Sequence, residues 1–251
     1  MILAFFLVSS NFSFTQVQII AHRGASYLAP ENTVASSKLA WELGADAVEV
    51  DIYMSKDNRI MCIHDSNTKR TSGHDHIVKD THSEILRQLD VGLFKDPKYK
   101  GERIPFLEEI IVEVPKGKEL VIELKCGIEA LPFLKKIIKK HGRNRSFSFI
   151  AFDFETIKAT KKAFPHNSCY WLCSNPDLLN KNIDLVPKAG LEGVSLHYNI
   201  INEQVSRRVK DLNLELFTWT VDAPDEAKRL ISSGVKGITT NRPGWLNDQI
   251  F

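Results

Sequence analysis

The chain has 251 residues, 43% of them apolar and 25% charged, and its 33 Lys and Arg side chains nearly balance 31 Asp and Glu, for a net charge of +2. This length and apolar content suffice for one large domain with a real core. The balanced charge argues against a nucleic-acid-binding protein and against general attraction to an anionic membrane.

The first sixteen residues differ from the rest of the chain. An apolar run from Ile2 to Val8 precedes a polar, serine-containing segment, and no Lys or Arg comes before it. The run is too short to cross a bilayer as a helix, and it is similar to the apolar core of a secretory signal peptide. We therefore expect a signal peptide at 1–16 and a secreted or periplasmic mature chain at 17–251. The alternative is a cytoplasmic protein in which this segment is a strand or plug closing the bottom of a barrel.

From residue 17 onward, short apolar runs alternate with segments of helical periodicity. In chain order, strands are expected at 17–21, 47–54, 59–64, 120–125, 146–152, 168–172, 193–196, 214–221 and 235–240. Helices are expected at 31–43, 128–141, 154–164, 177–189, 203–212 and 224–233. This alternation predicts a parallel sheet, and about eight units favour an α/β fold of the TIM (β/α)8 barrel type.

One segment interrupts the alternation. Residues 66–105 are polar, rich in His, Lys and Asp, and contain one short helical piece at 83–89. We interpret them as a small insertion in the single barrel domain. Because a long segment after a barrel strand lies at the face where active sites form, the insertion either covers the pocket or is an exposed segment with no contact to substrate.

Polar side chains gather at or near the carboxyl ends of the predicted strands, where barrels of this type form their active sites. They are His22, Arg23, Glu49, Asp51, His64, Glu123, Lys125, Trp219 and Asp222. Glu49 and Asp51 are two residues apart on one strand, so both side chains face the same side. Glu123 and Lys125 repeat that spacing on the strand at 120–125.

The three acids, Glu49, Asp51 and Glu123, suit one hard divalent cation, Mg²⁺ or Ca²⁺. Ion pairing with Arg23 and Lys125 without a metal is the alternative. Histidines can move protons near neutral pH, and an arginine can hold phosphate oxygens. A lone histidine at a strand end is often only a hydrogen-bonded core residue, but two beside acids and an arginine indicate metal-assisted chemistry on a phosphate ester.

The four cysteines give no sign of a metal or redox site. Cys62, Cys126, Cys169 and Cys173 form no Cys-x-x-Cys pair, which argues against zinc. Cys169 and Cys173 would lie about 13 Å apart along a strand, too far for a disulfide unless the chain bends. We therefore expect free thiols.

Several short motifs occur in a definite order between residues 17 and 245. They are His22-Arg23-Gly24, Pro30-Glu31-Asn32-Thr33, Glu49-Val50-Asp51, His64-Asp65, Ile104-Pro105-Phe106-Leu107-Glu108-Glu109, Glu123-Leu124-Lys125, Trp219-Thr220-Val221-Asp222 and Gly237-Ile238-Thr239-Thr240-Asn241-Arg242-Pro243. Each motif alone is a weak signal. Together, their order and spacing resemble the glycerophosphodiester phosphodiesterase family.

The resemblance implies a barrel enzyme that uses one divalent cation to hydrolyse glycerophosphodiesters to sn-glycerol 3-phosphate and an alcohol. It also implies a nucleophile supplied by the neighbouring glycerol hydroxyl, with a cyclic phosphate that water then opens. By analogy, the metal ligands are Glu49, Asp51 and Glu123, the general base is His22, the general acid is His64, and the substrate and phosphate contacts are Arg23, Lys125 and Trp219. Trp219 could instead simply fill the barrel mouth.

Two alternatives to this function stay open. One is a lysophospholipase D-like or other phosphodiesterase that acts on a lipid, and the other is a non-catalytic barrel that binds a phosphate ligand. Two positions depart from the commoner family pattern, because Ala151 replaces a frequent serine and Asn241 replaces a frequent aspartate. We expect neither residue to touch the metal site or the histidines.

Overall fold

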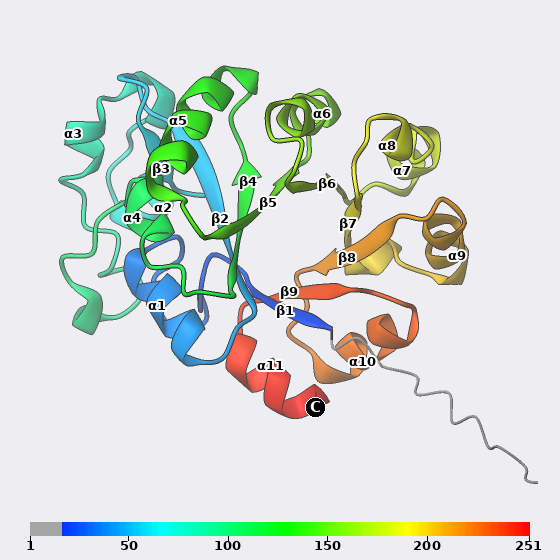
Figure 1. Cartoon of the computed structure of the whole chain (residues 1–251). Coiled ribbons are helices and arrows are strands. Elements are labelled where there is room, and N and C mark those ends of the chain that lie inside the picture. The colour runs from blue at the N-terminus through cyan, green and yellow to red at the C-terminus, as the bar shows by residue number, and fades with distance from the viewer. Residues whose placement is uncertain (1–16) are drawn as a thin grey trace, which may run out of the picture.

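The computed structural model describes residues 17–251, so the predicted signal peptide at 1–16 lies outside the described residues. Its strands form one sheet that closes on itself, because β1 pairs with both β9 and β2 (Figure 1). The strands are β1 (Gln18–Ala21), β2 (Ala47–Met54), β3 (Ile60–Cys62), β4 (Glu119–Leu124), β5 (Ser146–Ala151), β6 (Ser168–Cys173), β7 (Gly193–His197), β8 (Glu215–Trp219) and β9 (Gly237–Thr240). All except β3 run parallel, which confirms the predicted TIM barrel.

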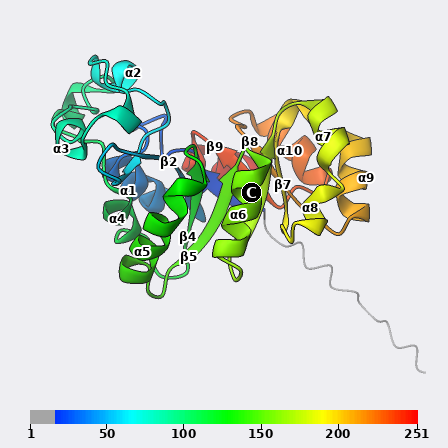
Figure 2. The ribbon, with the colours of Figure 1, turned by 90° about the horizontal axis from the view of Figure 1, so that it is seen from above.

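Helices surround the barrel on its outer side (Figures 1 and 2). They are α1 (Val34–Glu42), α2 (Lys69–Ser72), α3 (Ser83–Leu86), α4 (Leu107–Ile111), α5 (Leu131–His141), α6 (Phe154–Ala163), α7 (Pro176–Asn182), α8 (Leu185–Lys188), α9 (Glu203–Asp211), α10 (Pro224–Ser232) and α11 (Pro243–Ile250). Short 3₁₀ turns lie at η1 (Val78–Asp80), η2 (Pro97–Tyr99), η3 (Ile128–Ala130) and η4 (Tyr198–Ile200).

Two of the differences between the predicted and the observed helices have a clear local reason. The first begins at Val34 because the Thr33 side chain accepts a hydrogen bond from the backbone N–H of Ser36 and caps the helix there. The helix expected at 177–189 is divided into α7 and α8. Pro187 lacks an amide hydrogen and its ring would clash with the carbonyl four residues earlier, so one continuous helix cannot pass through it.

Apolar side chains fill two layers. The larger core lies between the strands and the surrounding helices, and it includes Val48, Val50 and Leu124. A smaller cluster inside the barrel contains Ile20 and Val121. Because alternate residues of a strand face opposite sides, burial of Val48 and Val50 outside leaves Glu49 and Asp51 facing the barrel interior. The four cysteines are free, as expected.

The strand β3 is not a barrel strand. It pairs antiparallel with the outer part of β2, so that Cys62 lies opposite Ile52. The insertion that follows packs around its own apolar cluster: Met61, Ile63, Val78, Leu86, Leu89, Val91 and Ile104. In Figure 2 its helices α2 and α3 lie at one side of the barrel. This packing makes the insertion a small ordered subdomain instead of a loose loop.

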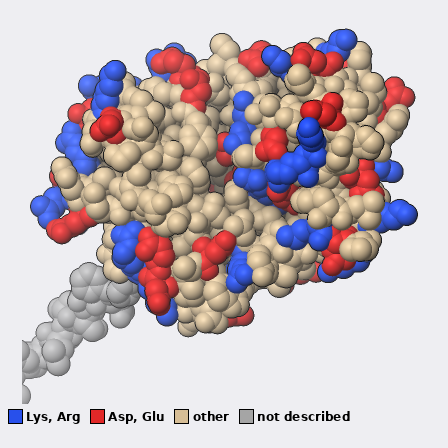
Figure 3. Space-filling model, turned by 180° about the vertical axis from the view of Figure 1, so that it is seen from behind, with Lys and Arg blue, Asp and Glu red and all other residues tan. Residues whose placement is uncertain are grey.

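The surface carries charges of both signs, and on the face shown in Figure 3 Lys and Arg side chains lie among Asp and Glu. Within residues 17–251, no helix has both the length and the apolar content to span a bilayer.

Candidate active site

A cavity of about 150 Å³ opens at the carboxyl ends of the barrel strands. It is lined by His22, Arg23, Glu49, His64, Glu123, Lys125, Ile150, Phe152, Leu172, Ser195, Trp219, Thr220 and Thr239. Among the described residues, none from 66–105 lines it, so the insertion does not cover this pocket. A larger groove of about 470 Å³ lies beside α7 and α9, but no cluster of potential metal ligands occurs there in the described part of the chain.

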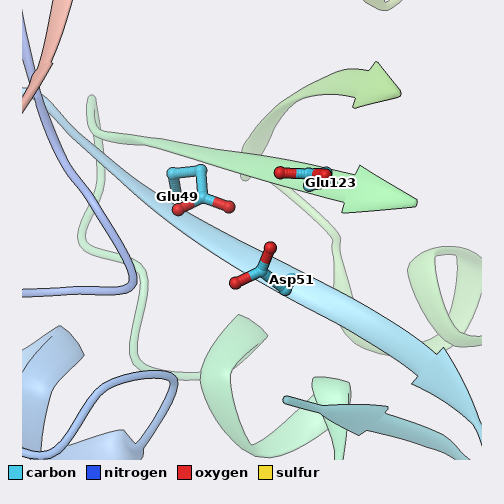
Figure 4. A group of neighbouring side chains, drawn as sticks. All are labelled: Glu49, Asp51 and Glu123. Carbon is cyan, nitrogen blue, oxygen red and sulfur yellow. The ribbon is translucent and has the colours of Figure 1, made fainter. Parts of the chain in front are cut away.

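The three predicted acids lie close together on the adjacent strands β2 and β4 (Figure 4). Asp51 and Glu123 are register partners on the adjacent parallel strands β2 and β4, and Glu49 lies two residues before Asp51. One oxygen from each carboxylate lies within 4.8 Å of the others, and all three side chains are buried. Because side chains alternate between the two faces of each strand, β2 and β4 bring three carboxylates close together on the inner face of the barrel.

Burial and mutual repulsion make this arrangement unfavourable when all three acids are charged. Burial raises the pKa of Glu49 well above its usual value, and the charges of Asp51 and Glu123 raise it further. Burial and the charge of Asp51 also raise the pKa of Glu123, to about 7, against the opposing effect of Lys125. The pKa of Asp51 is lowered, because Arg23 and Lys125 overcome the effect of its burial.

Two cations partly neutralise the acids. Arg23 Nε lies 3.3 Å from Asp51 Oδ2, and Lys125 Nζ lies 2.8 Å from Glu123 Oε1 and 3.5 Å from Asp51 Oδ1. Even so, Glu49 Oε1, Asp51 Oδ1 and Glu123 Oε1 are buried and accept no hydrogen bond, so Lys125 meets two of them only as an ion pair. Three converging carboxylate oxygens that accept no hydrogen bond match the ligand set of a hard divalent cation. The residues present therefore fit such a cation better than ion pairing alone.

The turn after β1 delivers Arg23 to the acids. Its backbone N–H donates to Glu49 Oε2 at 2.9 Å, in a left-handed conformation with φ of 56°. Gly24 follows with φ of 78°, and a Cβ atom there would lie 2.5 Å from Ser36 Oγ and 2.6 Å from the Ser36 backbone carbon. Glycine is therefore required at this turn both for its conformation and for the close approach of α1.

Gly24→Ala is expected to destabilise the protein by more than about 1 kcal/mol and to lower turnover, because the turn that carries His22 and Arg23 must shift. Thermal unfolding and steady-state kinetics would measure both effects. Gly44→Ala is the matched control, since Gly44 also has positive φ (82°) but nothing lies within 4 Å of the point that a Cβ atom would occupy there. Equal losses of stability and turnover in the two variants would contradict the role given to the contact with Ser36.

His22 directly follows β1, and a hydrogen bond with Asn241 fixes its ring. His22 Nδ1 lies 2.8 Å from Asn241 Oδ1. The Asn241 amide is oriented by Asp222, whose carboxylate accepts hydrogen bonds from Asn241 Nδ2 (2.7 Å) and from the Asn241 backbone N–H (2.8 Å). The expectation that Asn241 would not touch the histidines is therefore wrong, because the loop after β9 lies beside the end of β1. Burial and the charge of Arg23 lower the pKa of His22 to about 4, against the opposing effect of the hydrogen bond that His22 donates to Asn241.

His64 reaches the cavity by a route other than the one predicted. It was expected at the carboxyl end of a barrel strand, but β3 returns antiparallel along β2, and the Ile63 backbone N–H donates to the Asp51 carbonyl at 3.0 Å. His64 Nδ1 lies 2.7 Å from Asp65 Oδ1. Since the partners at Nδ1 of both histidines are oxygen acceptors, each Nδ1 is assigned the proton and each Nε2 is the nitrogen left to exchange one.

Two aromatic side chains form part of the cavity wall. Trp219 donates from Nε1 to the Ser195 carbonyl at 3.1 Å, and its ring meets the Phe152 ring edge to face at 5.4 Å between centroids. Phe152 was not predicted as a site residue, although it ends the predicted strand at 146–152, where strand-end position is a usable signal. Seven of the eight predicted site residues thus line one cavity, and the eighth, Asp51, lies against two of them, Arg23 and Lys125. The structure adds Asn241, Asp65 and Phe152 to the site.

The closed parallel barrel, the acidic cluster at its mouth and the two oriented histidines define a phosphoester hydrolase of the TIM-barrel class. Comparison with known proteins agrees. The model of the glycerophosphoryl diester phosphodiesterase family matches residues 22–245. A glycerophosphodiester phosphodiesterase from Caldanaerobacter subterraneus subsp. tengcongensis is 35% identical over 90% of this chain and 94% of its own length. Another from Bacillus subtilis is 27% identical, covering 91% and 84%.

Solved structures give the same result. A phosphodiesterase from Oleispira antarctica, solved in complex with the product sn-glycerol-3-phosphate, superposes with a TM-score of 0.88 at 27% identity and covers 95% of this chain and 98% of that one. The chain belongs to the glycerophosphoryl diester phosphodiesterase family.

Proposed function

We propose that this protein hydrolyses glycerophosphodiesters to sn-glycerol 3-phosphate and an alcohol, with His22 as general base and His64 as general acid. The observation that carries the proposal is a cluster of three buried carboxylate oxygens that accept no hydrogen bond, beside a cavity that two histidines line. Membership of the family and the product bound to the Oleispira antarctica relative support the same reaction.

The acidic cluster is proposed to hold one divalent cation, Mg²⁺ or Ca²⁺, through Glu49, Asp51 and Glu123. When bound, such a cation supplies Lewis-acid stabilisation of the phosphate charge. Arg23 and Lys125 would add fixed positive charge beside the phosphate oxygens, where water is largely excluded and charge is screened less. Trp219 and Phe152 would give the substrate an apolar wall.

The two histidines differ in the charge of their partners, and this difference supports their separate roles. His22 faces the neutral amide of Asn241, and its lowered pKa keeps the ring uncharged and able to accept a proton from the attacking oxygen. His64 faces the carboxylate of Asp65, which accepts from Nδ1 and so fixes the ring with Nε2 as the nitrogen that would pass a proton to the departing alcohol oxygen.

The small cavity supports a compact substrate. Its volume of about 150 Å³ is below the roughly 300 Å³ at which sites for drug-sized ligands begin. This favours a glycerophosphodiester with a soluble headgroup over a lipid with an acyl chain inside the barrel.

The test is release of glycerol 3-phosphate from glycerophosphocholine by the purified protein. We expect release with Mg²⁺ or Ca²⁺, its loss on adding EDTA, and its recovery when the cation is returned. Hydrolysis of lysophosphatidylcholine, assayed in parallel, tests the alternative that the enzyme acts on a lipid. A folded protein that releases glycerol 3-phosphate with neither cation would contradict the proposal and leave the lipid substrate or a binding role.

The cellular location is also a proposal. The apolar run at 2–8 supports cleavage of a leader near residue 16 and a secreted or periplasmic enzyme. The N-terminal sequence of the protein recovered from its host measures this, and a chain that retains residues 1–16 in the cytoplasm would refute it.

A further inference from the structure

Arg70 lies outside the cavity, on helix α2 of the insertion, yet it contacts two loops of the site. Its Nη1 and Nη2 donate to Glu31 Oε2 and Oε1, each at 2.7 Å, and its Nε donates to Asp65 Oδ2 at 2.7 Å. One planar guanidinium thus joins the loop after β1 to the loop after β3. Such a bidentate contact fixes the geometry of both partners, which a single point charge would not do.

The contact with Asp65 leads directly to His64. Asp65 uses one carboxylate oxygen for Arg70 and the other for His64 Nδ1, at 2.7 Å in each case. Hydrogen bonds from Arg70 and His64 lower the pKa of Asp65 to about 2, against the effect of its partial burial. The carboxylate of Asp65 therefore stays charged and in place. It holds the His64 ring in one orientation and in the tautomer that has its proton on Nδ1.

The contact with Glu31 leads in the same way to Arg23. Glu31 Oε1 accepts from Arg70 Nη2 and also from Arg23 Nη1, at 3.0 Å. Arg23 in turn lies against Asp51 through its Nε, at 3.3 Å. Glu31 thus separates two guanidinium groups that would otherwise repel, and it fixes the direction from which Arg23 enters the cavity.

We propose that Arg70 is a positioning residue, through which the insertion holds His64 and Arg23 in their working orientations. This inference rests on the roles proposed above for those two residues. It also gives the insertion a function, since residues 66–105 support the site from outside without lining its cavity.

Arg70→Ala is expected to lower kcat by about 10- to 100-fold, the loss typical when the support of a catalytic group is removed. Arg70→Lys is expected to recover little, because one ammonium cannot donate to both carboxylates in the same geometry. The Arg70 side chain is 45% exposed, so millimolar guanidinium is expected to enter the vacated position and restore part of the turnover of Arg70→Ala. In an Asp65→Asn background, Arg70→Ala should cost less than in the wild type, because part of its effect passes through Asp65.

Arg229→Ala is the matched control. Arg229 is 43% exposed and donates to both oxygens of Glu226, but it lies on α10 and contacts no residue of the site. We expect this variant to keep the wild-type kcat. That result would show that losing a partly exposed arginine ion pair does not by itself lower turnover.

A readout independent of activity separates this inference from the proposed reaction. In ¹H–¹⁵N spectra of histidine-labelled protein, the Nδ1–H signal of His64 should be present in the wild type and shifted or broadened in Arg70→Ala and Arg70→Lys. If the wild type releases no glycerol 3-phosphate, the reaction is wrong and the spectra still test the positioning role. Wild-type kcat with an unmoved His64 signal would overturn the role of Arg70. Should the alanine variant fail to fold, Arg70→Lys, which keeps the charge, decides between these outcomes.

Discussion

Replacement of His64 by alanine is expected to lower kcat for glycerol 3-phosphate release by about 10²- to 10⁴-fold while the protein stays folded. His22→Ala should have an effect of similar size. Each ring lines the cavity at a strand or loop end and fills no part of the main apolar core, so neither substitution removes packing that the barrel requires. Steady-state kinetics and circular dichroism of the two variants measure turnover and fold separately.

The two roles can be distinguished by the leaving group. A p-nitrophenyl ester of glycerol 3-phosphate releases an alcohol that needs no protonation, so the acid becomes dispensable while the base does not. His64→Ala should then recover much of its turnover, and His22→Ala should recover little. His166→Ala, in an exposed turn before β6, is the control and should behave as the wild type. Near-normal turnover of glycerophosphocholine by either cavity variant would remove that histidine from the mechanism, and recovery by His22→Ala instead would exchange the roles.

The barrel and its acidic cluster could be predicted from the sequence because both arise from local patterns. Alternation along β2 places Glu49 and Asp51 on one side, and parallel register then brings Glu123 beside Asp51. The helix expected at 177–189 is divided in the structure because the prediction did not take Pro187 into account. Local chemistry was thus sufficient for the elements and for the direction of their side chains.

The contacts that orient the histidines could not be predicted in this way. Asn241 lies 219 residues after His22 in the chain, and the two meet only because β9 and β1 close the barrel. His64 arrives on an antiparallel strand whose pairing depends on how far β2 extends beyond the barrel. Arg70 lies in a segment whose sequence is typical of a solvated surface. The closed fold determines which loops lie next to one another. The local periodicity of the sequence does not predict these contacts.

Removal of the divalent cation with EDTA is expected to abolish turnover and to leave a folded protein whose stability decreases as the pH rises. Without the cation, burial and the charge of Asp51 raise the pKa of Glu123 to about 7, whereas an unfolded glutamate titrates near 4.3. Between these values the folded state binds more protons than the unfolded state, so stability falls with increasing pH, by on the order of 3 kcal/mol for Glu123 alone. Asp51, whose pKa is lowered, loses its contribution only at more acidic pH and does not affect this window.

Mg²⁺ or Ca²⁺ should reverse this trend, because the cation requires the deprotonated carboxylates and its binding releases the proton held by Glu123. The increase in melting temperature on adding the cation should therefore be small near pH 5 and large above about pH 7. Glu123→Gln is the control, since glutamine has similar size but does not titrate. The part of the pH dependence that Glu123 contributes in EDTA should disappear, and the part that remains comes from Glu49, whose pKa is also raised. Stability in EDTA that is constant or increases from about pH 5 to pH 7 would show that the three acids are balanced by Arg23 and Lys125 alone, and the case for a metal at this cluster would then fail.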